Sequence, residues 1–406
     1  MHVTRLRALI FGAIFILPLA ASGALPAPTP STLHALVEQA WLRSPAGRSI
    51  AARQGEIDAA RDVSGSWIAG QPELGLSQRN GRWSEQNGAR ESEVSLSAPF
   101  WMPGQRSARR NLANQSATEL QAQMRKVRLD IAGAVRGQLW DAAASQALLE
   151  EKIAHLQYTE ALADEVKRRV TAGDLARVDA LLANQEVQAV RISVEQAKAE
   201  AHASLSKLRI LTGPGTALPA QPEPLAAAAD TENPRLQAAR ATENRARAAL
   251  RLAQSSRSAP PTVSLSVRDQ RDRPLGSPER SLGLSLQVPI GTAGRNRPVE
   301  AEVQTQIAVA AAEAEQAADV AEADLELARR QLDHARAALA AAGARVNAMR
   351  EHQQLIEKAF RLGERGLADL LRSRALAHEA QVSQRQQQVA LGRAHAQFNQ
   401  ASGVLP

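Results

Sequence analysis

The stretch SLSAPFWMPG at residues 95–104 decides the fold, because its framework returns at residues 285–294 as SLQVPIGTAG. The two stretches share their Ser, Leu, Pro and Gly positions at a constant separation of 190 residues. The same separation continues downstream, where Gly173, Asp179, Leu181 and Gly213 recur as Gly363, Asp369, Leu371 and Gly403. Half of these eight matches are Gly or Pro, the residues that set turns, caps and strand ends. The sequence therefore predicts two copies of one supersecondary unit.

Upstream of the first predicted hairpin loop the separation is 189 residues. There Pro45, Pro72, Leu76 and Arg79 match Pro234, Pro261, Leu265 and Arg268. One residue inserted in the hairpin loop of the second copy explains the difference. We therefore expect a first repeat at 25–213, a Pro/Ala-rich linker at 214–232 and a second repeat at 233–406.

Four short segments alternate apolar and polar residues as strands do. They are PELGLSQR (72–79), ESEVSLSA (91–98), PTVSLSVR (261–268) and RSLGLSLQ (280–287). Polar, turn-rich connections predict two hairpins, at about 72–98 and 261–288. Their apolar faces need a partner. Either the hairpins cap a helical bundle as a small sheet, or they form the wall of a membrane barrel, which requires about eight strands and hence several chains.

Long helices are predicted over the rest of each repeat, at about 105–212 and 295–403. No proline occurs between Gln105 and Gly213 or between Val299 and Leu405, and Gly173 and Gly363 mark the reversals. A helix from Ser107 to Lys167 alone would be roughly 90 Å long at ~1.5 Å per residue. Aromatic residues make up only 3% of the chain. The predicted fold is mostly α with a small β part, built from coiled-coil helical hairpins in two tandem repeats.

The N-terminus reads as a signal peptide over residues 1–24, with Arg5 and Arg7, an apolar run and a small-residue cleavage site at Ala24. An uncleaved anchor is the alternative, although the apolar run is shorter than the ~20 residues of a membrane helix. The chain has no cysteine, so disulfides and a lipidated cysteine are excluded. Removing Arg5 and Arg7 lowers the formal charge from +7 to +5. This mild excess and the scarcity of aromatic residues do not indicate a nucleic-acid partner.

The order of these elements, repeated once, resembles the TolC-type outer-membrane efflux factors. The expected order is signal peptide, helix pair, hairpin, very long helix, turn and return helix. The residues that carry the resemblance are the helix starts Ser44-Pro45 and Asn233-Pro234, the strand ends Ala98-Pro99 and Val288-Pro289, and the helix reversals RRVTAGDLARVDALL (168–182) and AFRLGERGLADLL (359–371). Residues 99–110, PFWMPGQRSARR, look similar to the heavy-metal, CzcC-like branch of that family.

This resemblance implies a homotrimer in the cell outer membrane, with a long periplasmic portion. Each chain would give four strands to a twelve-stranded barrel surrounded by outer-membrane lipid, and its helices to a periplasmic tunnel. The implied partners are a periplasmic adaptor (membrane fusion) protein and an inner-membrane pump of the RND type. The implied function is a passive duct for small solutes or ions, with divalent heavy-metal cations as candidate cargo and no cofactor.

Two other classes of function compete with the channel, an enzyme and a coiled-coil structural protein. An enzyme is disfavoured because the sequence shows no nucleophile with a base, no phosphate-binding loop and no metal triad. A secreted or periplasmic coiled-coil structural protein or adhesin shares the helical composition and the export signal. Such a stalk does not need an amphipathic hairpin in each half, and this feature favours the channel.

The candidate functional residues lie at the predicted helix reversals. The resemblance places Gly173, Asp174, Gly363, Glu364 and Gly366 at the periplasmic tip, where the adaptor docks. The acids also suit the first turn of the returning helix, which gives them a purely structural reading.

Asp179 and Asp369 are candidate acids of the tunnel mouth that would favour cations. The alternative is a solvated helix face on which they pair with Arg177 and Arg372. The eight histidines show no pair at i and i+4, so no metal site is predicted. Basic clusters are usually solvated, but Arg106, Arg109 and Arg110 follow a predicted strand closely enough to meet lipid phosphates.

Overall fold

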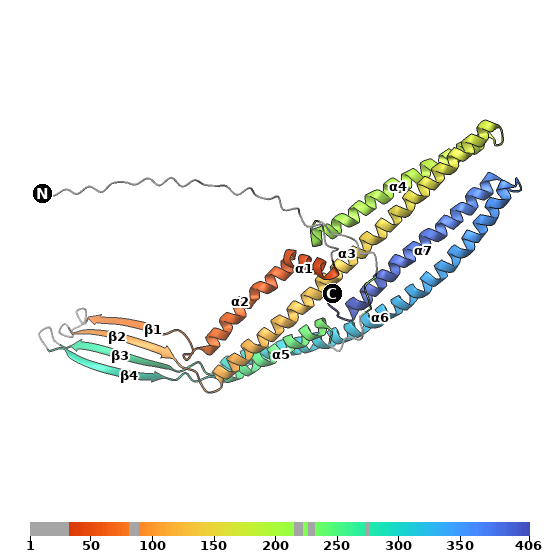
Figure 1. Ribbon diagram of the computed structural model, residues 1–406. Helices are drawn as coiled ribbons and strands as arrows, with labels where there is room; N and C mark the ends of the chain where they lie inside the picture. The colour runs from red at the N-terminus through yellow and green to blue at the C-terminus, as the bar shows by residue number, and fades with distance from the viewer. Residues whose placement is uncertain (1–31, 81–88, 215–221, 226–231, 273–276) are drawn as a thin grey trace, which may run out of the picture.

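The computed structural model describes residues 32–80, 89–214, 222–225, 232–272 and 277–406. The expected signal peptide and most of the expected linker lie outside these ranges. The first repeat contains α1 (Leu33–Arg43), α2 (Pro45–Gly65), β1 (Glu73–Asn80), β2 (Arg90–Pro99), α3 (Gln105–Ala172) and α4 (Arg177–Thr212). The second contains α5 (Pro234–Ser255), β3 (Thr262–Arg271), β4 (Glu279–Gln287), α6 (Ala293–Arg361) and α7 (Leu367–Ala401). Figure 1 shows an elongated chain with the sheet at one end and the helix reversals at the other.

The two central helices are close to equal in length, with 68 residues in α3 and 69 in α6. At 1.5 Å per residue each is about 100 Å long. The helix expected from Ser107 to Lys167 therefore extends further at both ends. None of the helices in the described ranges has both the length and the hydrophobicity needed to cross a bilayer.

The four strands form one antiparallel sheet in the order β1-β2-β3-β4. Leu76 lies opposite Val94 in the first hairpin, and Leu265 lies opposite Leu284 in the second. The first residues of these pairs are 189 apart and the second are 190 apart. This agrees with an extra residue in the second hairpin's connection, as the sequence predicts.

One face of this sheet is apolar and exposed. Strand pairing brings alternate residues of all four strands onto it, with Val94 opposite Val267 and Leu96 opposite Leu265. Nine of its side chains are between 46% and 77% exposed: Leu74, Leu76, Val94, Leu96, Leu265, Val267, Leu282, Leu284 and Leu286. The opposite face carries Ser, Gly, Glu and Arg, where the Arg268 guanidinium pairs with both Glu91 and Glu93.

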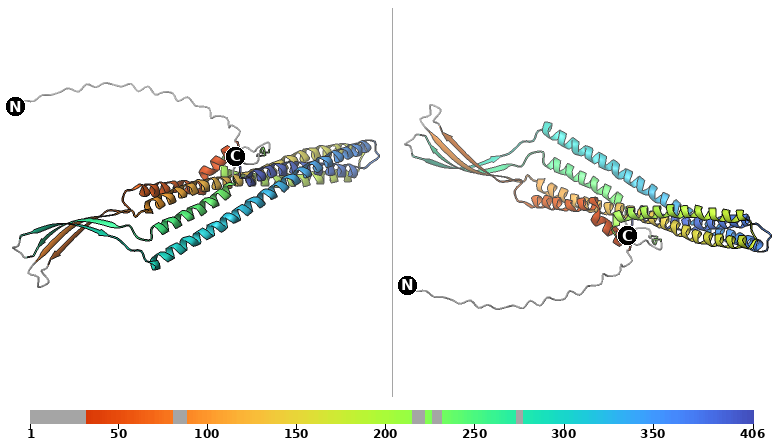
Figure 2. Two further views of the ribbon diagram at one scale, coloured as in Figure 1. Left: turned by 90° about the horizontal axis from the view of Figure 1, so that it is seen from below. Right: turned by 90° about the horizontal axis from the view of Figure 1, so that it is seen from above.

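The helices continue the sheet as a single layer. Next to the sheet, α2, α3, α5 and α6 lie side by side in the same order as the strands (Figure 2). Towards the other end α4 packs on α3, α3 on α7 and α7 on α6. Among the described strands, β1 pairs only with β2 and β4 only with β3. The sheet is therefore open along both edges, and the helix layer that follows it is equally one element thick.

Two features break the symmetry of the repeats. The helix pair expected before each hairpin is present in the first repeat as α1 and α2, but within the described residues α5 alone precedes the second hairpin. Gly104 caps the start of α3 with a φ of 87°, whereas its counterpart Gly294 lies inside the first turn of α6. The turn before each helix is nevertheless alike, because Gln105 N–H donates to the Met102 carbonyl at 3.1 Å and Arg295 N–H donates to the Thr292 carbonyl at 3.2 Å.

The middle of the chain is held by a buried ion pair between the linker and both repeats. Arg136 on α3 is 3% exposed, and its guanidinium makes three hydrogen bonds with Glu223, two from Nε at 3.1 and 3.2 Å and one from Nη2 at 3.0 Å. Its Nη1 donates to Gln400 on α7 at 2.8 Å and to the Val404 carbonyl at 3.2 Å. Asn399 adds a hydrogen bond to Glu223 at 3.1 Å. This linker clasp, Arg136 with Glu223, ties the two halves together.

Candidate functional site

The two helix reversals have the same backbone geometry. Gly173 follows α3 with a φ of 87°, and Gly363 follows α6 with a φ of 76°. Asp174 N–H donates to the Arg169 carbonyl at 2.9 Å, and Glu364 N–H donates to the Ala359 carbonyl at 2.9 Å. This pattern, with a left-handed Gly, satisfies the last carbonyls of a helix. The sequence-based assignment of Gly173 and Gly363 to the reversals is correct.

The acids after these turns have local partners. The Asp179 carboxylate accepts a hydrogen bond from the Ala176 N–H at 3.1 Å, which caps the first turn of α4. Asp369, at the same place in α7, lies 3.7 Å from the Arg365 guanidinium. The expected pairing with Arg177 and Arg372 is wrong, because one acid bonds backbone and the other an arginine before the helix. Their role at a tunnel mouth stays a prediction.

Both reversals lie together at the end of the molecule farthest from the sheet (Figure 1). A cluster of buried apolar side chains joins them, drawn from α3, α4 and α7: Leu162, Val166, Ala183, Leu367 and Leu370. Gly363, Glu364 and Gly366 are exposed beside this cluster. Val178, Leu181 and Leu362 expose between 62% and 66% of their surface. This end, which we call the tip, is thus a rigid, partly apolar surface.

A row of side-chain contacts joins the two helical hairpins along α3 and α7. Arg393 pairs with Asp141, and Arg385 lies 3.6 Å from Glu151. Nearer the tip, the Arg374 guanidinium lies over the Tyr158 ring, 4.8 Å from its centroid. In each contact a cation on α7 meets an acid or an aromatic ring on α3. We call this row the seam.

The seam also contains a close helix contact that depends on glycine. A Cβ atom added at Gly392 on α7 would overlap the Trp140 ring on α3. The equivalent position of the first repeat is His202, which is exposed. Gly392 therefore reflects the packing of the seam, which the repeat pattern alone does not reveal.

Two histidines meet in the seam although 223 positions separate them in the sequence. The His155 and His378 rings stack with centroids 3.9 Å apart and planes 20° apart. Burial, reinforced by His378 and Lys152, lowers the pKa of His155 to about 4. Burial also lowers the pKa of His378. The search for an i, i+4 pair missed this contact, because only tertiary packing creates it.

No metal site accompanies the pair. Within the described ranges, no group of three or more His, Asp or Glu side chains is arranged to hold a metal ion. The stacked rings present faces rather than nitrogen lone pairs to one another, which does not suit coordination.

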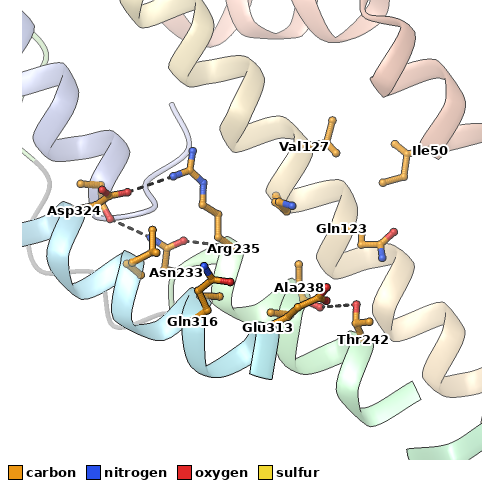
Figure 3. Close-up of a pocket in the computed structure, with 16 residues that line it drawn as sticks. Ile50, Gln123, Val127, Asn233, Arg235, Ala238, Thr242, Glu313, Gln316 and Asp324 are labelled. Carbon is orange, nitrogen blue, oxygen red and sulfur yellow. Dashed lines mark hydrogen bonds and ion pairs between the residues drawn. The ribbon is translucent and has the colours of Figure 1, made fainter. Parts of the chain in front are cut away.

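A hollow of about 560 Å³ in the helix layer lies between α3, α5 and α6 (Figure 3). Small alanine side chains of α5 and α6 leave this space. Its central cation, Arg235, lies 2.9 Å from Asp130 and 3.6 Å from Asp324. Because Arg235 is paired with these two carboxylates, we regard this pocket as part of the scaffold.

Of the three arginines expected near lipid, Arg106 has a structural role. Its guanidinium donates to the Ser64 and Gly65 carbonyls at the end of α2. Arg109 lies over the Trp101 ring, 5.4 Å from its centroid, and Arg110 is exposed. Two of the Arg106 donors are thus used inside the chain, and the lipid contact of these arginines stays a prediction.

The positive φ at the reversals gives a test of the tip. In the double variant Gly173→Val/Gly363→Val, a Cβ atom meets nothing within 4 Å at either site, so the strain comes from the backbone alone. We expect a local cost of about 1–2 kcal/mol per site. Hydrogen exchange should show faster opening at residues 170–178 and 360–368, with exchange near the sheet unchanged.

Gly366→Val is the matched control for this double variant. Gly366 has equally open surroundings but a φ of −82°, which any residue adopts. Equal exchange rates in the control and the double variant would show that the left-handed backbone does not stabilise the tip.

Comparisons with known proteins agree with this architecture. Residues 36–214 match the family model described as outer membrane efflux protein. No curated protein sequence matches the chain. The outer membrane protein VceC of Vibrio cholerae is similar in structure, with a TM-score of 0.71, 17% identity, and coverage of 92% of this chain and 96% of that one. The open MtrE outer membrane channel of Neisseria gonorrhoeae has a TM-score of 0.72, 17% identity, and coverage of 92% and 89%.

Proposed function

We propose that this chain is the outer-membrane duct of a tripartite efflux system. Two findings support the proposal: residues 36–214 match the outer membrane efflux protein family, and both repeats share the fold of solved outer membrane channels. In this function it carries small solutes or ions from the periplasm to the exterior. A periplasmic adaptor and an inner-membrane pump of the RND type complete the system. The duct itself performs no chemistry.

The observation that carries the proposal is the open sheet with one exposed apolar face. Exposure of nine large apolar side chains on one face to water is energetically unfavourable, whereas contact with lipid is favourable. The polar face, with Arg268 between Glu91 and Glu93, then lines an aqueous lumen. A coiled-coil adhesin does not require such a face, so the channel is favoured over it.

The number of strands explains why several copies are needed. Four strands are too few to close a barrel, and each additional copy can pair its β1 with the β4 of its neighbour. Because four is even, this junction is antiparallel like the rest of the sheet. Three copies give twelve strands. Each copy also has two long-helix hairpins, so three copies place six such hairpins around a periplasmic tunnel. This is the proposed homotrimer.

The proposed adaptor-docking site is the tip, with Gly173, Asp174, Gly363, Glu364 and Gly366. It lies at the opposite end from the sheet and exposes apolar side chains between charged ones. Asp179 and Asp369 are the proposed acids of the tunnel mouth. Divalent heavy-metal cations are the proposed cargo, on the resemblance of residues 99–110, and the pump would select them.

The proposal is tested by assembly, location and conductance of the full chain. Expected results are a trimer in detergent, recovery in the outer-membrane fraction and ion conductance in planar bilayers. Because the chain has no cysteine, single cysteines at Val178 or Leu362 should crosslink to the adaptor in cells, whereas one at exposed Glu56 on α2 should not. Recovery as a buffer-soluble monomer without conductance would contradict the duct.

A further inference from the structure

The seam between α3 and α7 contains one contact that differs in kind from the others. Arg393, Arg385 and Arg374 on α7 each meet an acid or the Tyr158 ring on α3. These contacts keep their attraction at any physiological pH, since arginine is always charged. His378 instead meets His155, so this contact consists of two groups that gain the same charge when the medium is acidified.

The groups that face the pair do not neutralise such a charge. Lys152 on α3 acts on both imidazoles and disfavours their protonation. Glu186 on α4 favours protonation of His155, but its effect is the smallest of those acting there. The Arg374 and Glu357 side chains, on α7 and α6, pair with each other at 3.2 Å. Among the charges that act on His155, Lys152 opposes protonation more than Glu186 favours it.

Protons have a route to the pair. A pocket of about 300 Å³ lies beside His155, and Tyr158, Glu186 and Arg372 are among its lining residues. Both imidazoles are half-buried rather than sealed. The buried Nε2 atom of His378 has no hydrogen-bond partner. A separated, hydrated His378 would gain that hydrogen bond, which a packed one lacks.

We propose that the His155–His378 stack is a proton-operated joint between the two helical hairpins of the chain. At neutral pH the uncharged rings stack and hold α3 against α7. Acidification places two positive charges at stacking distance beside Lys152, and their repulsion separates the helices. The pair lies next to the apolar cluster that joins the two reversals, so its separation weakens the packing of that cluster and lets the reversals move apart. The joint concerns the chain's own conformation and does not depend on the export function.

The size of the response follows from linkage. Imidazoles whose pKa lies below the ordinary 6.5 in the packed seam bind protons more weakly than in an open one. The packed seam is therefore favoured above pH 6.5, and its population falls as the pH is lowered towards 4. The ratio of open to packed seam rises by up to about tenfold per pH unit for each proton taken up.

The test is a distance measurement across the tip as a function of pH. Spin labels at Thr171 on α3 and Leu362 after α6, both exposed, are introduced into the cysteine-free full chain, diluted with unlabelled chains. Double electron–electron resonance should show a longer-distance population that grows about tenfold or more between pH 7.5 and pH 5. An unchanged distance distribution down to pH 4.5 would overturn the joint.

Three variants make the assignment specific. His155→Phe/His378→Phe keeps two stacked rings that cannot be charged, and it should abolish the pH response. His202→Phe, at an exposed histidine of α4, should respond as the parent does. Glu186→Gln removes the favourable acid and should move the transition to lower pH, which tests the joint even if the double variant does not assemble. A double variant that responds like the parent would also overturn the proposal.

Discussion

Replacing Leu96 and Leu265 with arginine is expected to abolish insertion of the protein into the outer membrane. The two side chains lie opposite each other on β2 and β3, at the centre of the apolar face, and are 55% and 46% exposed. An arginine on the lipid face costs about 2–4 kcal/mol near the middle of the bilayer, so the pair would cost about twice that. The measurement is the share of the protein recovered as trimer in the outer-membrane fraction.

Ser95→Arg/Ser266→Arg is the matched control for this experiment. These serines are the next cross-strand pair along the same two strands, and they point to the polar face. We expect the control to insert and assemble, with an altered conductance. Equal insertion of the leucine and serine variants would mean that the apolar face does not meet lipid.

Replacing Arg136 with leucine is expected to produce the largest loss of stability in the helical part. The change removes five hydrogen bonds of the guanidinium and leaves Glu223, which is 16% exposed, without its cation. Breaking a buried ion pair from one side costs about 3–5 kcal/mol. Thermal unfolding followed by circular dichroism should show a clearly lower midpoint.

Two further variants identify the cause. Arg136→Leu/Glu223→Leu should recover part of the loss, because no unpaired charge remains. Arg191→Leu breaks the exposed pair with Glu160 and should cost at most about 1 kcal/mol. An Arg136 variant no less stable than the Arg191 variant would show that the linker clasp does not hold the repeats together.

Much of the architecture could be predicted because it depends on local patterns. Alternating Leu and Ser predicted all four strands to within about three residues, since a sheet with one apolar face requires a period of two. The reversals at Gly173 and Gly363 were equally readable, because a left-handed backbone favours glycine. The predicted first and last residues of the helices were less exact, because helix ends depend on local hydrogen bonds.

The contacts across the seam could not be predicted in the same way. The His155–His378 stack, the Arg393–Asp141 pair and the Trp140–Gly392 contact join residues far apart in the sequence. They depend on how α3 and α7 are rotated against each other, and helical periodicity does not fix that rotation between distant helices. The repeat pattern also hid them, because none of the three contacts has a counterpart at the equivalent positions of the other repeat.

The strand order has a consequence for how the chain reaches its native state. Each hairpin and each long-helix pair joins neighbouring segments, and such local contacts form quickly. The pairing of β2 with β3 instead connects the two repeats, with the whole of α3, α4 and α5 between the partners. We therefore expect the sheet to be completed late. Until then two separate hairpins expose their apolar faces and unpaired backbone edges in the periplasm. Newly exported chains would aggregate there unless a chaperone binds them.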